Sequence, residues 1–204
     1  MKKIFTLNYD QPSDYQFSLD SIQLAEKIIE LYKNRQDLNQ LRCLDLCCGC
    51  GVIGLEIYFF LQAITHFDFV DIEESYRPYF EKNCEKFSPP PNFNFYQKNY
   101  LFHEGQYDLI VCNPPYFFSN EGILSPSSFK NRCRFFLDAS FKELIESIAR
   151  LLAPSGEAYI LINKGEAYGK NRIEEAKTYL ESNFKLESLG KIRITELVKV
   201  SRNS

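Results

Sequence analysis

The stretch Cys43-Leu44-Asp45-Leu46-Cys47-Cys48-Gly49-Cys50-Gly51 decides the predicted fold. Its first four residues form a short, mostly apolar run, which predicts a buried strand. The glycines that follow predict a sharp turn into a helix over residues 52–63, because a backbone without side chains can turn tightly and approach a ligand closely. In an open α/β sheet such a turn lies at the carboxyl end of a strand, where ligands bind.

Strand-like and helix-like segments alternate on both sides of this turn, which is typical of an α/β protein with a largely parallel sheet. We expect one domain over residues 1–204, with residues 1–40 as a helical lead-in packed on the core. The fold class we expect is α/β, with a mostly parallel seven-stranded sheet, an antiparallel edge hairpin and helices on both faces. The expected helices cover residues 18–34, 52–63, 73–87, 138–152 and 166–182, and the expected strands cover 43–46, 67–71, 93–96, 107–112 and 158–162, with two more starting near Phe184 and Thr195. Residues after 116 read as a polar loop, and Pro154-Ser155-Gly156 predicts a turn.

The composition is that of an ordinary globular protein and excludes wholesale disorder, with 45% hydrophobic and 25% charged residues. The formal net charge is -3, so the chain lacks the basic balance typical of nucleic-acid binders. Any nucleic-acid contact must therefore come from a local basic patch.

The cysteine content points to a reducing compartment. The chain has 7 cysteines, an odd number, and no signal peptide is recognisable at Met1-Lys2-Lys3-Ile4, so we expect a cytoplasmic protein. Cys47, Cys48 and Cys50 lack the paired spacing and histidine partners of a zinc site, so we expect no metal. The apolar runs are too short to cross a bilayer, so we expect no membrane segment.

An acid follows the glycine turn at the spacing of a nucleoside-binding site. Asp71 ends the next predicted strand, about twenty residues after the turn, where a carboxylate can accept two hydrogen bonds from ribose hydroxyls. From this motif alone a dinucleotide-binding fold, or a glycine turn used only for packing, remains an alternative.

Asn113-Pro114-Pro115-Tyr116 is the more specific motif, and it follows the predicted strand over residues 107–112. An asparagine oxygen and the next carbonyl can both accept hydrogen bonds from a flat NH2 group, holding its nitrogen toward a sulfonium methyl group. The two prolines remove backbone donors and fix the carbonyl's direction, and the tyrosine offers a face for stacking a base or an amide. The bland alternative is a simple turn after a strand.

Together these motifs resemble the class I, Rossmann-like methyltransferases of the "small" group. Within that group, three features are similar to bacterial tRNA adenine-N6 methyltransferases acting beside the anticodon of a valine tRNA. The three features are Tyr15-Gln16-Phe17-Ser18-Leu19-Asp20-Ser21, the residue Phe117 after the tetrapeptide, and Arg132-Cys133-Arg134.

The resemblance implies S-adenosylmethionine as the cofactor and assigns roles by position. Asp45, Gly49 and Gly51 would shape the methionine end of its site, and Asp71 would hold the ribose. Cys47, Ile72 and Asn99 would also contact the cofactor. Asn113 to Tyr116 would hold the acceptor, with Asn113 also beside the cofactor. Two positions depart from the family: Cys47 stands where a glycine is usual, and Asn99 stands where an aspartate commonly contacts the adenine amino group.

Several residues near Asn113-Pro114-Pro115-Tyr116, which we call the acceptor motif, are candidates for substrate contact. We expect Lys130, Arg132 and Arg134 to meet phosphates, with Lys164, Lys170 and Arg172 possible neighbours, although such clusters are often merely solvated. Of Phe117 and Phe118 we expect one to contact substrate and the other to pack beneath the loop.

Three functions compete. The leading hypothesis is methylation of adenine N6 in tRNA, with RNA as the partner. The runner-up is methylation of a glutamine N5 amide in a protein release factor, since that amide fits the same motif. The third is a catalytically silent methyltransferase fold that serves as a binding module. The sequence leaves the oligomeric state open.

Overall fold

The computed structural model describes residues 8–14 and 16–203 of the 204-residue chain. The first seven residues of the predicted lead-in, and Tyr15 of the opening motif, lie outside the described residues. The rest of the lead-in contains helix α1 (Leu19–Tyr32) and the short helix η1 (Leu38–Gln40).

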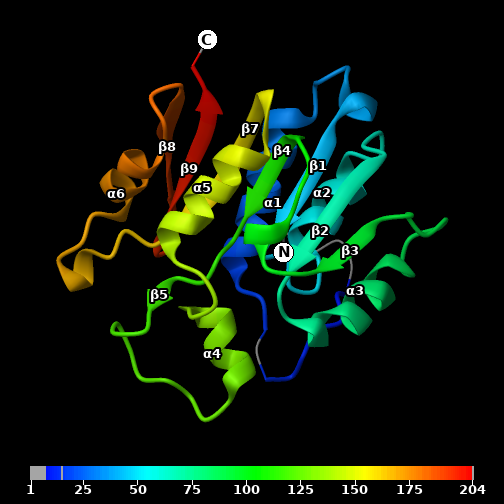
Figure 1. Ribbon diagram of the computed structural model, residues 1–204. Coiled ribbons are helices and arrows are strands. Elements are labelled where there is room, and N and C mark those ends of the chain that lie inside the picture. The colour runs from blue at the N-terminus through cyan, green and yellow to red at the C-terminus, as the bar shows by residue number, and fades with distance from the viewer. Residues whose placement is uncertain (1–7, 15, 204) are drawn as a thin grey trace.

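The centre of the molecule is a seven-stranded sheet of order β3-β2-β1-β4-β7-β9-β8 (Figure 1). Strands β3, β2, β1, β4 and β7 run parallel, whereas β9 runs antiparallel to both of its neighbours. This confirms the predicted parallel sheet with an antiparallel edge hairpin. The strands are β1 (Arg42–Leu46), β2 (His66–Asp71), β3 (Asn94–Gln97), β4 (Tyr107–Cys112), β7 (Leu152–Ile162), β8 (Phe184–Ile192) and β9 (Thr195–Arg202).

Helices cover both faces of the sheet and create two separate apolar cores. Alternation along β4 shows this directly: Leu109 and Val111 enter one core, while Ile110 and Cys112 enter the other. The first core is closed by α1, α2 (Val52–Phe60) and α3 (Arg77–Cys84), and the second by α5 (Phe141–Leu151) and α6 (Arg172–Tyr179). In Figure 1, α5 accordingly lies in front of the sheet and α1 behind it. A sheet buried on both faces requires near-continuous apolar strands, which β1 and β4 provide.

Two predicted helices are each divided into a 3-10 turn and a shorter α-helix. The one over residues 73–87 is a 3-10 turn, η2 (Glu74–Tyr76), followed by α3. The one over residues 166–182 is a 3-10 turn, η4 (Glu166–Tyr168), followed by α6, because Gly169 adopts a left-handed conformation and Asn171 starts a new helix by capping it.

The turn predicted at Pro154-Ser155-Gly156 is wrong, because these residues lie within β7. Leu152 pairs with Tyr107 and Glu157 with Leu109, so the residues between form an irregularity in the pairing with β4. Gly156 is needed there, since a Cβ at this position would lie 2.5 Å from the carbonyl oxygen of Tyr107.

The segment predicted as a polar loop after the acceptor motif contains regular structure. It holds β5 (Phe117–Phe118), α4 (Ser128–Arg134) and β6 (Phe135–Phe136), and the two short strands pair in parallel. Ser127 caps α4 by accepting a hydrogen bond from the backbone N–H of Lys130. A further 3-10 turn, η3 (Tyr100–Phe102), follows β3.

Within the described ranges, every helix is too short or too polar to cross a bilayer.

Candidate active site

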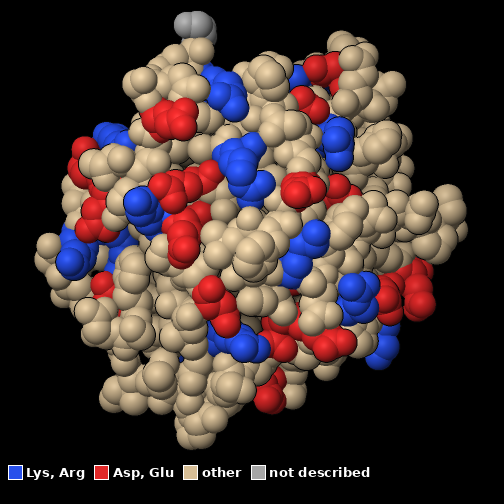
Figure 2. Space-filling view, viewed as in Figure 1, with Lys and Arg blue, Asp and Glu red and all other residues tan. Residues whose placement is uncertain are grey.

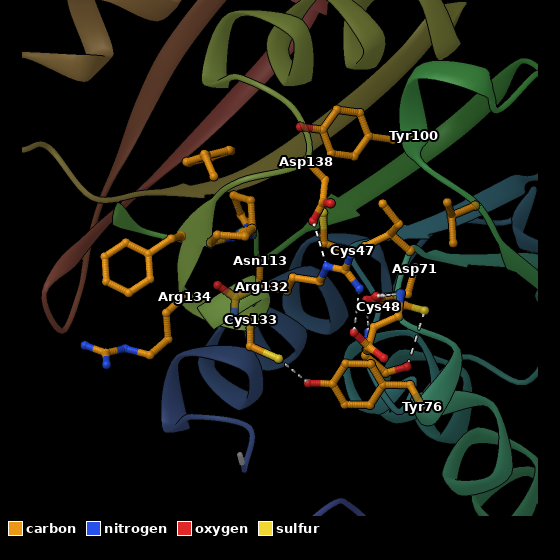
Figure 3. A pocket seen from close by; sticks show the side chains of 18 of the residues that line it. Cys47, Cys48, Asp71, Tyr76, Tyr100, Asn113, Arg132, Cys133, Arg134 and Asp138 are labelled. Atoms are coloured by element: carbon orange, nitrogen blue, oxygen red, sulfur yellow. Dashed lines mark hydrogen bonds and ion pairs between the residues drawn. The ribbon is translucent and has the colours of Figure 1, made fainter. Parts of the chain in front are cut away.

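A pocket opens where four parallel strands end. Its walls come from the segments that follow β1, β2, β3 and β4, together with α1 and the segment containing α4 (Figure 3). Parallel strands bring their carboxyl ends to one edge of the sheet, which places these segments side by side. The predicted site residues that line it are Cys47, Gly49, Asp71, Ile72, Asn99, Asn113, Pro114, Pro115, Tyr116, Phe117, Arg132 and Arg134, whereas Asp45, Gly51 and Lys130 do not.

The glycine turn has three residues in the left-handed region. Gly49 has φ 54° and Gly51 has φ 80°, and a Cβ on Gly51 would lie 2.7 Å from the ring of Phe80. Cys47 has φ 58°, a conformation that costs an L-residue about 1–2 kcal/mol relative to glycine. Cys47 therefore keeps the turn of a glycine and carries a thiol at the pocket wall.

Asp71 connects the end of β2 to this turn. Its carboxylate accepts hydrogen bonds from the backbone N–H groups of Gly49, at 2.8 Å, and Glu73, at 2.9 Å. A carboxylate has about four lone-pair sites, so sites remain for hydroxyl donors in the pocket. Burial raises the pKa of Asp71 to about 6, against the lowering effect of the backbone hydrogen bonds, so the group is ionised at neutral pH.

Asp45 lies beneath the turn and is fully buried. One carboxyl oxygen accepts a hydrogen bond from the N–H of Gly54 in α2 at 2.8 Å, and the other has no partner within the described part of the chain. Burial raises the pKa of Asp45 to about 8. Asp45 therefore joins β1 to α2 and shapes the site from behind.

Asn99 lines the pocket after β3, with both ends of its amide engaged. Its oxygen accepts from the N–H of Leu101 at 3.0 Å, and its NH2 donates to the carbonyl of Asp138 at 3.1 Å. The amide oxygen keeps one lone pair for another donor.

The Asn113 side chain is held from two directions at the end of β4. Its NH2 donates to the hydroxyl of Ser21 in α1 at 2.9 Å, and its oxygen accepts from the Tyr116 hydroxyl at 2.7 Å. The contact with Ser21 holds the amide against α1. Ser21 belongs to one of the sequence features that resemble the family, but the sequence alone does not indicate its role.

The backbone of the acceptor motif is fixed as well. The N–H of Tyr116 donates to the carbonyl of Arg134 at 3.1 Å, and the carbonyl of Tyr116 accepts from Nη1 of Arg172 at 3.1 Å. Arg172 is only 2% exposed and forms a buried ion pair with Glu121. Arg172 is therefore a buried support of the motif and does not belong to an exposed basic cluster, either as a phosphate contact or as a solvated residue.

The three predicted phosphate contacts have different surroundings. Arg132 lies near two carboxylates, with Nη1 3.5 Å from Glu73 and Nε 3.2 Å from Asp138, so its charge is matched across the pocket (Figure 3). Arg134 has no ion pair with any described residue, and its guanidinium lies over the rings of Phe117 and Phe135. Lys130 is half-buried on α4 and away from the pocket.

The two phenylalanines after the motif also differ. Phe117 lines the pocket, whereas Phe118 packs against Phe136 and beneath the guanidinium of Arg172.

Among the described residues there is no group of three or more histidine, cysteine, aspartate or glutamate side chains arranged to hold a metal ion.

Residues 17–185 match the family model described as "Methyltransferase small domain". The chain belongs to this family of methyltransferase domains.

Among curated proteins, the chain is similar to a tRNA1(Val) (adenine(37)-N6)-methyltransferase of Dyadobacter fermentans, with 31% identity over 63% of this chain and 54% of that protein. A protein of the same name from Aliivibrio salmonicida is 30% identical over 78% of this chain and 65% of its own length. The chain thus spans about half to two thirds of these relatives.

Among solved structures, the chain is similar to ribosomal protein L11 methylase from Lactobacillus delbrueckii subsp. bulgaricus. The TM-score is 0.64 at 17% identity, covering 93% of this chain and 81% of the other. This likeness shows the shared fold of the class I methyltransferases.

The burial of Asp45 predicts a defined pH dependence of stability. The unfolded chain ionises this carboxyl above about pH 4, whereas the folded protein keeps it protonated until about pH 8, so folding loses stability as the pH rises through that window. Asp45→Asn removes this loss and preserves an acceptor for the N–H of Gly54. Urea unfolding measures the free energy of unfolding of both proteins. The variant should gain stability relative to the unaltered protein from about pH 4 to pH 8, and the difference should stay constant above pH 8. A difference independent of pH would contradict the assignment.

Proposed function

We propose that this protein transfers a methyl group from S-adenosylmethionine to the N6 amino group of an adenine in tRNA. The observation that carries the proposal is the Asn113 amide, which is held by Ser21 and lies in the same pocket as the glycine turn. Adenine in tRNA is favoured as the acceptor because the chain is similar to tRNA adenine-N6 methyltransferases.

The residues present fit the cofactor. Gly49 and the carboxylate of Asp71 lie together on one wall, with lone pairs left on that carboxylate for ribose hydroxyls. When bound, the cofactor supplies an electrophilic methyl group on a sulfonium. The neighbouring Asn99 oxygen has a lone pair left for an adenine amino group.

Asn113 supplies the polar contact to the acceptor. Its oxygen accepts a hydrogen bond from a flat NH2, which fixes the direction of the nitrogen and favours the positive charge that develops there. Pro114 and Pro115 line the same wall and carry no competing N–H groups. No metal or strong base is required for this step.

Nucleic-acid contact rests on Arg134. Its guanidinium lies over two aromatic rings at the pocket wall and is not matched by a described carboxylate, as a phosphate or base contact requires. On the face drawn in Figure 2, basic and acidic side chains are interspersed, in keeping with the net charge of -3. RNA binding must therefore depend on a few local contacts. We also propose a cytoplasmic location, because the 7 cysteines are free thiols and thiols persist in a reducing compartment.

The acceptor is tested by incubating the protein with radiolabelled S-adenosylmethionine and either bulk tRNA or a purified release factor. We expect label in tRNA, recovered as N6-methyladenosine after nuclease digestion. Label in the release factor and none in RNA would show that the acceptor is a glutamine amide and not an adenine. Absence of cofactor binding by calorimetry would favour a silent binding module.

Asn113→Ala should remove most turnover and leave cofactor binding largely intact. Loss of one such polar contact typically lowers kcat by about 10²–10³. The matched control is Asn34→Ala, a similar truncation at an exposed position just after α1. Near-normal turnover of Asn113→Ala would contradict the assigned role.

Arg134→Ala should weaken tRNA binding about tenfold. It should also make the slope of log affinity against log salt concentration shallower by about 1, the value for one lost phosphate contact. Arg132→Ala is the comparison, because its charge is already matched by two carboxylates. We expect the smaller effect there, measured by filter binding over a range of salt. Equal losses in both variants would refute the distinction between the two arginines.

A further inference from the structure

Asp20 is a buried acid beside the acceptor motif that the proposed chemistry does not use. It lies in the first turn of α1 and is 2% exposed, and the next residue, Ser21, holds the Asn113 amide. Burying a carboxylate is costly unless it is paired and hydrogen-bonded, so its partners identify what it stabilises.

Those partners are a tyrosine and an arginine. The Tyr116 hydroxyl lies 3.0 Å from Oδ2 of Asp20, and Nη1 of Arg193 lies 3.3 Å from Oδ1. Arg193 occupies the turn between β8 and β9 with φ 53°. Asp20 thus joins the sheet-edge hairpin to the acceptor motif.

The Tyr116 hydroxyl carries one hydrogen and lies within reach of two acceptors from the described part of the chain. It lies 2.7 Å from the Asn113 oxygen and 3.0 Å from Asp20, so it can donate to only one of them at a time. The Asn113 oxygen is also the atom that must accept from the substrate NH2. A tyrosine that donates to this oxygen occupies one of its two lone pairs, which limits how the substrate NH2 can approach and weakens the oxygen as an acceptor.

We propose that Asp20 is a positioning residue that takes the Tyr116 hydrogen when an acceptor amine engages Asn113. An ionised carboxylate is a stronger acceptor than an amide oxygen, so the hydroxyl has a favourable alternative. Arg193 keeps the carboxylate in place from the opposite side. Asp20 does not touch the substrate and acts only through Tyr116. This inference rests on the proposed function of the site.

A double-mutant cycle separates this role from general support of α1. Asp20→Asn keeps the shape of the side chain but removes the charged acceptor, and Tyr116→Phe removes the shared hydrogen. We expect Asp20→Asn to lower kcat about tenfold, as for loss of a hydrogen bond to a charged group, with the Kd for S-adenosylmethionine unchanged. In the Tyr116→Phe background the same substitution should change kcat less than about twofold, because the groups act as a unit.

The control is Glu26→Gln, which neutralises an exposed acid on the same helix and should leave kcat unchanged. If Asp20→Asn does not fold, Arg193→Gln takes its place in the cycle, because that side chain is 47% exposed. The expectation is again a loss of kcat that depends on the Tyr116 hydroxyl.

Equal losses in the two backgrounds, or no loss in the first, would overturn the inference while leaving the proposed function intact. If the unaltered protein transfers methyl groups to a glutamine amide instead, the cycle applies to that acceptor, since its NH2 uses the same Asn113 oxygen. If the unaltered protein transfers no methyl group, the proposed function fails and this inference fails with it.

Discussion

The burial of β1 and β4 on both faces is the constraint on which the site depends. Side chains on these strands alternate between two apolar cores, so groups that do chemistry must lie where the strands end. Asp45 is the exception within a strand, and it remains buried with a raised pKa and one hydrogen bond to α2. Asp71 and Asn113 instead end or follow their strands and line the pocket. The same apolar strands thus make the sheet stable and gather the polar groups at one edge.

Motifs that depend on local chemistry were predictable from the sequence. The glycine turn, the acid at the end of β2 and the tetrapeptide after β4 each follow an apolar run, and parallel pairing brings such ends together. The order of strands and helices was predictable for the same reason. What the sequence could not supply were contacts between residues far apart in the chain.

Three features illustrate this limit. Helix α4 is seven residues of largely polar character, too short for helical periodicity to be recognised. Pro154-Ser155-Gly156 has the composition of a turn, but the close approach of Tyr107 keeps it within a strand. Arg172 carries a charge that suggests solvent, yet Glu121 neutralises it in the interior, and nothing near Arg172 in the sequence indicates that partner. Tertiary context overrode local preference in the last two cases, whereas α4 lacked a recognisable local signal.

The contact between Arg172 and the Tyr116 carbonyl has an evolutionary consequence. This guanidinium belongs to α6, and it also lies over the ring of Phe118, so it supports the chain where it leaves the tetrapeptide. A substitution in α6 can therefore remove a support of the tetrapeptide without changing any residue that lines the pocket. A comparison of sequences restricted to pocket residues would overlook such an exchange.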